Sequence, residues 1–362
     1  MFNSKLIAAF LIALAMAVPA TASAAAGKAG AIVFSMVTVD HREYEVEGKK
    51  AEPKAPQGGL YAMRDHHLNQ LTEDPADTEP AFSADGKTIA FVRSGDVYAM
   101  RADGSGQRRL TSGPEVDGRP LVSPSGRFVV FERRASAGAP RDLYTVKTGG
   151  SGLHPLTSSP EDDHEASFSP DGSAIAFVRS TAETGGGTAD DVYTVRPSGA
   201  RLARLTRTAL IDEYAPRNLG KTIVFSRGES GEGPSAYADI YTMRSDGRKV
   251  RELIAGAGSS YVVDATTNGR TLLFRRDEGL WVKRIGGKGR RLADLPDQSK
   301  TNAVFSSDGR QVAAFTATDE DQSLSVIDVA TGRRAYAEVV DYYESEVTTT
   351  IGPILAWQPV RR

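Results

Sequence analysis

The chain has 362 residues, 40% of them hydrophobic, and its 44 Lys and Arg nearly balance 46 Asp and Glu, for a formal net charge of −2 at pH 7. No basic run of the kind that neutralises phosphates occurs, so nucleic acid is not an expected partner. The sequence has no cysteine, which excludes disulfides and a lipid-anchored lipoprotein, and its 36 Gly and 18 Pro suit a turn-rich all-β protein.

The first 24 residues have the composition of a secretion signal. Lys5 supplies the positive charge, residues 6–18 are apolar, and Ala22-Ser23-Ala24 forms a small-residue cleavage site. A membrane anchor is the alternative, but the apolar run is shorter than the roughly 20 residues that a span needs. We therefore expect a mature chain that begins near Ala25, with residues 25–30 as a short lead. It should be soluble and monomeric, either extracellular or periplasmic, with no integral membrane segment.

A repeated phrase follows. It is PAFSADGKTIAFVRSGDVYAM from Pro80 and ASFSPDGSAIAFVRS from Ala166, each followed by a Leu-Thr pair. A repeat of this length is one small antiparallel sheet, which buries its faces only by stacking against further copies. The sequence therefore predicts an all-β fold, a β-propeller of four-stranded blades that occupies residues 31–360 as a single domain.

The number of blades follows from the Phe that closes the second strand of each repeat. It recurs at intervals of 40 to 57 residues, at Phe34, Phe91, Phe131, Phe177, Phe225 and Phe274, with Phe315 as a slipped seventh copy. Residues 354–360 read as a first strand around Trp357 that lacks a second, whereas residues 31–36 lack a first. We expect these two ends to pair and to close a seven-bladed ring.

Charged residues recur in register near one face of the predicted ring. An acid precedes the first hairpin of four blades, at Asp77, Asp117, Asp163 and Glu213, and an Arg follows the anchoring Phe, at Arg93, Arg133, Arg179, Arg227 and Arg276. Blade six has Ser260 with Arg276, and blade seven has Lys300 with Ala317. The pattern permits either structural salt bridges or an asymmetric rim that binds a polar ligand or an extended peptide at the channel mouth.

His164 is flanked by Asp162, Asp163 and Glu165 and belongs to this ligand-binding rim. A divalent cation there is one alternative, although such sites draw ligands from several blades and only His41 is expected to join His164 on this face. We expect no catalytic residue, no metal and no cofactor.

The phrase Phe-Ser-Pro-Asp-Gly-x-x-Ile-Ala-Phe, with Asp-hydrophobic-Tyr-x-Met and Leu-Thr after it, resembles the TolB-type propeller repeat, which also forms the propellers of prolyl-oligopeptidase-like enzymes. The resemblance implies a binding or scaffolding propeller more often than an enzyme, and no Gly-x-Ser-x-Gly nucleophile elbow occurs in the chain. We expect a secreted scaffold that binds an extracellular or periplasmic protein, peptide or polar ligand through its loop-rich face. The alternative is a metal-dependent propeller lyase or hydrolase that uses His164 and nearby carboxylates.

Overall fold

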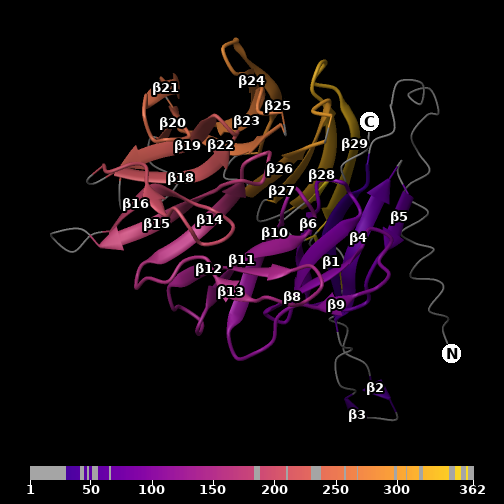
Figure 1. Ribbon diagram of the computed structural model, residues 1–362. Helices are drawn as coiled ribbons and strands as arrows, with labels where there is room; N and C mark the ends of the chain where they lie inside the picture. Colours follow the sequence, from indigo (N-terminus) through magenta and orange to yellow (C-terminus); the bar gives the residue numbers. More distant parts are fainter. Residues whose placement is uncertain are drawn as a thin grey trace.

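The computed structural model describes residues 30–40, 45–46, 49–50, 56–64, 67–182, 188–208, 211–229, 238–256, 258–266, 268–296, 300–306, 308–317, 321–341, 347–351 and 356–357. Its strands form seven antiparallel sheets arranged as the blades of a ring (Figure 1). The described residues contain no helix with the length and apolar character that crossing a membrane requires.

Each blade is a run of consecutive strands. Blade 2 contains β6 (Asp77–Phe82), β7 (Thr88–Arg93), β8 (Asp96–Arg101) and β9 (Arg108–Arg109). Blade 3 contains β10 (Val116–Val122), β11 (Phe128–Arg134), β12 (Arg141–Lys147) and β13 (His154–Pro155). Blade 4 contains β14 (Asp162–Phe168), β15 (Ile175–Ala182), β16 (Thr188–Val195) and β17 (Ala203–Arg204).

The remaining complete blades follow the same order. Blade 5 contains β18 (Ile211–Asn218), β19 (Thr222–Glu229), β20 (Ala238–Arg244) and β21 (Arg251–Ile254). Blade 6 contains β22 (Ser260–Ala265), β23 (Thr271–Arg276), β24 (Gly279–Arg284) and β25 (Gly289–Asp294). Blade 7 contains β26 (Lys300–Phe305), β27 (Gln311–Ala317), β28 (Asp321–Asp328) and β29 (Arg334–Asp341).

Blade 1 is built from both ends of the chain. It contains β1 (Ile32–Asp40), β4 (Gln57–Arg64), β5 (His67–Gln70), β30 (Val347–Ile351) and β31 (Ala356–Trp357), while β2 (Glu45–Val46) and β3 (Lys49–Lys50) pair separately. The register places Ile32 opposite Trp357 and Met36 opposite Ile351. The predicted closure of the ring by the two termini is therefore confirmed.

The hydrophobic core lies between blades rather than within them. Seven clusters of buried side chains are found among the described residues, and each joins two neighbouring blades. The cluster that closes the ring packs Phe34 of blade 1 against Phe315 and Leu324 of blade 7. A single blade cannot bury its two apolar faces, so this packing is what the repeat requires.

The anchoring Phe predicted for each blade is buried and lies opposite an aromatic residue of the third strand. Phe91 faces Tyr98, for example, and Phe177 faces Tyr193. In blade 7 the Phe is displaced by one residue, since Ala314 faces Ser325 and Phe315 faces Leu324. The seventh copy is therefore slipped, as the sequence indicates.

Two faces of the ring matter for function. We call the face that carries the turns after the first and third strands of each blade the hairpin face, and the opposite one the top face. In the first turn of blade 4, Gly172 has φ +71°, a left-handed conformation that glycine accepts without strain. Asp171 accepts hydrogen bonds there from Ser169 Oγ and the Ser173 N–H, at 2.6 and 3.0 Å. The Asp-Gly pair of the repeat thus builds this turn.

Candidate functional site

The acids and arginines predicted to form a rim lie directly opposite each other on the first and second strands. The register pairs Asp77 with Arg93, Asp117 with Arg133, Asp163 with Arg179, and Glu213 with Arg227. The shortest ion-pair distances for the four pairs are 2.6, 2.6, 2.5 and 2.8 Å, in that order. In the three Asp pairs, Nε and Nη2 of the Arg each donate to one carboxylate oxygen, which is the strongest geometry for this interaction.

Each of these arginines also covers two aromatic rings. The guanidinium carbon of Arg179 lies 5.9 Å from the centre of the Phe177 ring and 5.0 Å from that of Tyr193. Arg93, Arg133 and Arg227 repeat this contact in their own blades. The hydrogen bonds to Asp163 raise the pKa of Arg179 above its ordinary value. The guanidinium is thus fixed by both charge and ring stacking.

The acids also link neighbouring blades through the Thr of the repeat's Leu-Thr pair. Thr206 of blade 4 accepts the Val192 N–H at 2.8 Å, and its hydroxyl lies 2.9 Å from Oε2 of Glu213 in blade 5. The equivalent Thr157 accepts the Leu143 N–H at 2.9 Å. Both the charge and the hydrogen-bonding capacity of Glu213 are therefore used inside the scaffold.

Blades 6 and 7 depart from the pattern as the sequence indicates. Ser260 lies opposite Arg276, and Lys300 lies opposite Ala317. The four carboxylate pairs are consequently confined to one arc of the ring, in blades 2 to 5.

His164 and Asp163 are neighbours in sequence but have separate surroundings, because successive side chains of a strand point to opposite faces. Asp163 binds Arg179, whereas His164 Nε2 lies 3.3 Å from Ser180 Oγ. Only 9% of His164 is exposed, and this burial lowers the pKa of its imidazole to about 4. The ring is neutral at pH 7 and is a weak base there.

A second ion-pair network lies beside His164. Arg141, at the start of β12, binds Asp162 at 2.5 Å and Glu132 at 3.2 Å. Glu132 Oε1 accepts the N–H of Glu165 at 2.8 Å, and burial raises the pKa of the Glu132 carboxyl. Arg119 Nε also lies 3.9 Å from Glu132 Oε2, so two arginines face the carboxylates of Glu132 and Asp162.

Asp190 lies beside this network, at the top-face end of β16. Its carboxylate accepts a hydrogen bond from Ser180 Oγ, and its N–H donates to Asp212 Oδ1 at 3.0 Å. Burial, followed by the charges of Asp212, Glu165 and Asp162, raises the pKa of Asp190 to about 6. Within the described residues no cationic side chain forms an ion pair with Asp190. We call Glu132, Asp162, Glu165, Asp190 and Asp212 the carboxylate cluster.

Two tyrosines adjoin this cluster. The rings of Tyr214 and Tyr261 lie 6.0 Å apart, and both hydroxyl groups are buried without a hydrogen-bond partner among the described residues. Burial raises the pKa of Tyr214, and the charges of Tyr261, Asp212 and Glu165 raise it further. A buried hydroxyl without a partner is costly, and both hydroxyl groups are closed off from solvent.

A metal does not fit this arrangement. No group of three or more His, Asp or Glu side chains that could hold a metal ion occurs in the part of the chain that the structure describes, and His41 lies outside that part. The donors around His164 are instead used in hydrogen bonds to Ser180 and Arg141. No metal-dependent step can be built on these residues.

Sequence reasoning found His164 and the rim but missed Glu132, Arg141, Ser180 and Asp190. They lie on second and third strands, so no repeat position marks them as a group. One signal was available: Glu132 occupies the position after the anchoring Phe, where blades 2 and 4 have Val92 and Val178. A carboxylate at a valine position of a repeat is a departure that indicates a local role.

No family model matches this sequence, and no curated protein matches it either. Among solved structures, TolB from Acinetobacter baumannii superposes with a TM-score of 0.53 at 16% identity, over 85% of this chain and 80% of that one. An oligogalacturonate lyase in complex with manganese superposes with a TM-score of 0.59 at 13% identity, over 75% of this chain and 84% of the lyase. A puromycin-hydrolysing peptidase of Mycobacterium tuberculosis superposes with a TM-score of 0.61 at 14% identity, over 79% of this chain and 50% of the peptidase.

TolB, the lyase and the peptidase share this propeller architecture with the chain, and at such low identities the likeness shows the fold alone. Together with the seven closed blades and the repeat, it shows that this chain is a TolB-like seven-bladed β-propeller.

Proposed function

We propose that this chain is a non-catalytic binding propeller that recognises a basic ligand at the carboxylate cluster of its top face. The ligand would be an ammonium or guanidinium group, presented by a peptide or by a segment of a partner protein. The carrying observation is Asp190, which has no ion-pair partner among the described residues and accepts a hydrogen bond from Ser180 Oγ; burial and the charges of Asp212, Glu165 and Asp162 raise its pKa to about 6. A bound cation would relieve this repulsion.

The surroundings of Asp190 supply the other contacts that such a ligand needs. The side chain of Asp162 is 30% exposed, so the cluster can be approached from solvent. The ring of Tyr214, with that of Tyr261 packed beside it, lies near Asp212 and Glu165. Carboxylates with aromatic neighbours suit a cationic group, since both attract positive charge.

The four acid–Arg pairs of the rim are assigned a scaffold role in this proposal. Their charges neutralise each other, and the Thr links use the remaining acceptor atoms. Their direct participation in ligand binding, including that of Arg276, stays a prediction of the sequence. The lyase or hydrolase alternative is the less favoured one, because burial lowers the pKa of His164 to about 4 and no group of three metal-ligating side chains occurs among the described residues.

The test is a calorimetric titration with tetralysine as the probe. Neutralising Asp190 as Asp190→Asn keeps the acceptor for Ser180 Oγ and removes the charge, so we expect affinity to fall at least about fivefold. Glu252→Gln is the matched control, since this exposed carboxylate lies on the outer strand β21. Equal affinities for both variants, or no binding of tetralysine by the unmodified protein, would reject the proposal.

We also propose that the protein acts outside the cytoplasm. The proposal rests on the composition of residues 1–24, which is that of a secretion signal and which lies outside the described residues. Intact-mass measurement of the exported protein should give a chain that starts near Ala25. A mass that includes residues 6–18 would contradict this.

A further inference from the structure

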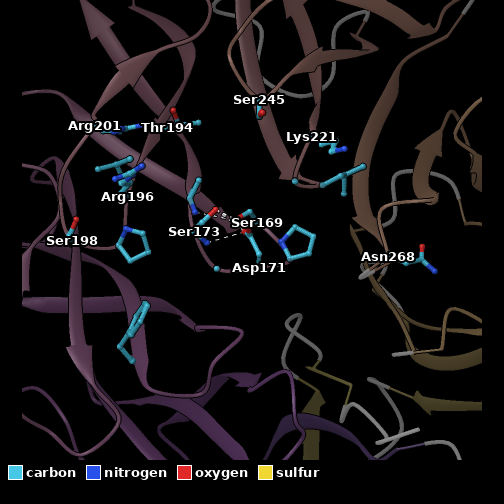
Figure 2. Close-up of a pocket in the computed structure, with 18 residues that line it drawn as sticks. Ser169, Asp171, Ser173, Thr194, Arg196, Ser198, Arg201, Lys221, Ser245 and Asn268 are labelled. Carbon is cyan, nitrogen blue, oxygen red and sulfur yellow. Dashed lines mark hydrogen bonds between the residues drawn. The ribbon is translucent and has the colours of Figure 1, made fainter.

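The hairpin face carries a pocket on the side of the ring opposite to the carboxylate cluster. It has a volume of about 1060 Å³ and lies over blades 3 to 6. Figure 2 shows the turn with Ser169, Asp171 and Ser173 at its centre, Arg196 and Arg201 on one side, and Lys221 on the other. This pocket is larger than a site for a single inorganic ion.

The charge of the pocket is positive. Arg196, Arg201 and Lys221 are exposed, and none of them forms an ion pair within the described residues. The one carboxylate of the lining, Asp171, accepts hydrogen bonds from the hydroxyl and backbone groups of its own turn. Those bonds lower the pKa of Asp171 and consume its acceptor capacity. Three cations therefore remain available to a ligand.

A second observation is independent of charge. Arg201 has φ +59°, in the left-handed region that residues with a Cβ rarely adopt. The equivalent turn positions of blades 2 and 3 are occupied by Gly106 and Gly152, with φ +67° and +74°. Blade 5 has Lys249 at this position with φ +56°. Glycine suits this conformation, so each of the two cations can be replaced by glycine without disturbing its turn, and only Arg201 lines the pocket.

We propose that this pocket binds an acidic peptide segment of a partner protein, a site beyond the basic-ligand site of the top face. The two sets of cations stand on opposite sides of the Ser169–Ser173 turn, so a ligand must present at least two separated carboxylates. Between them the pocket offers hydroxyl and amide groups, from Ser198, Ser245 and Asn268, that match peptide N–H and C=O groups. An acidic peptide satisfies both requirements, whereas one phosphate satisfies neither.

The test uses labelled hexaglutamate at low salt, with fluorescence anisotropy as the readout. Arg201→Gly removes one cation and introduces the residue best suited to φ +59°, so the variant should fold as well as the unmodified protein. We expect its affinity for hexaglutamate to fall at least about fivefold. Lys249→Gly is the matched control, because Lys249 has φ +56° at the same turn position of blade 5 but does not line the pocket. It should change affinity by less than about twofold.

Three outcomes would overturn the proposal. Hexaglutamate that does not bind at low salt excludes an acidic-peptide site. Equal loss in Arg201→Gly and Lys249→Gly shows that general surface charge attracts the probe. Displacement of hexaglutamate by inorganic phosphate at matched ionic strength shows a single-anion site. Tetralysine measures the top-face site, so loss of hexaglutamate binding in Arg201→Gly with tetralysine binding intact separates this pocket from the carboxylate cluster.

Discussion

Asp163 and Arg179 lie directly opposite each other on β14 and β15, and two hydrogen bonds of 2.5 and 2.7 Å join them. Asp163 is fully buried, so its charge has no access to water. The Asp163→Asn substitution should therefore destabilise the protein by on the order of 3 kcal/mol, because Arg179 would be left buried without its counter-charge. Urea unfolding monitored by circular dichroism measures the loss.

The control for this prediction is Asp294→Asn. Asp294 binds Arg291 at 2.7 Å, but its side chain is 82% exposed, so its removal should change stability by less than about 0.5 kcal/mol. An unchanged unfolding midpoint for Asp163→Asn would show that the rim does not hold the blades together.

Thr206 provides a test of the links between blades. Thr206→Val keeps the shape but removes the hydroxyl that accepts the Val192 N–H and contacts Glu213. Two buried polar groups would lose a partner, at a cost of about 1–3 kcal/mol. Thr88→Val, on the half-buried start of β7, serves as the comparison for a threonine whose hydroxyl makes no such link. Equal melting temperatures for the two variants would contradict the assignment.

Closure of the ring can be tested by removing the last strand. Deletion of residues 352–362 removes β31, which pairs with Ile32 and Val33 of β1. The exposed edge of β1 should then lower the melting temperature and promote association through strand pairing. Size-exclusion chromatography with light scattering would detect the association. A truncated chain that stays monomeric with an unchanged melting temperature would show that closure does not depend on this strand.

The pKa of Asp190 predicts how stability depends on pH. Its folded-state value of about 6 lies above the ordinary 3.8, so proton binding favours the folded protein. This contribution is present below about pH 4 and is lost as the pH rises through 6. Asp190→Asn should therefore be more stable than the unmodified protein at pH 7, by on the order of 1 kcal/mol given partial exposure, and equally stable near pH 4. Urea titrations at both pH values measure the difference, and a constant difference would be the contrary result.

The pKa shift of His164 changes the stability of the protein in the opposite direction over part of the same pH range. Burial lowers its pKa from 6.5 to about 4, so stability falls as the pH drops through that window. The contribution of Asp190 to stability is therefore measured as the difference in unfolding free energy between Asp190→Asn and the unmodified protein at each pH. Both proteins contain His164, so its contribution is common to both.

The sequence was sufficient for the fold because the repeat encodes strand register directly. The anchoring Phe, the Asp-Gly turn and the incomplete end repeats fix the blade number and the closure, and even the opposition of Asp163 and Arg179 follows from antiparallel pairing. The carboxylate cluster could not be found in this way. Arg141 comes from blade 3, while Asp190 and Asp212 come from blades 4 and 5, and their proximity depends on how the blades stack.

The central claim is that the carboxylate cluster, rather than the rim of acid–Arg pairs, is where a ligand binds. A crystal structure of the protein with tetralysine tests it most directly. The account predicts a lysine ammonium within hydrogen-bond distance of a carboxylate oxygen of Asp190 or Asp212, with the pair of Asp163 and Arg179 unchanged. An ammonium bound at Asp77, Asp117 or Asp163, with its Arg partner displaced, would contradict it.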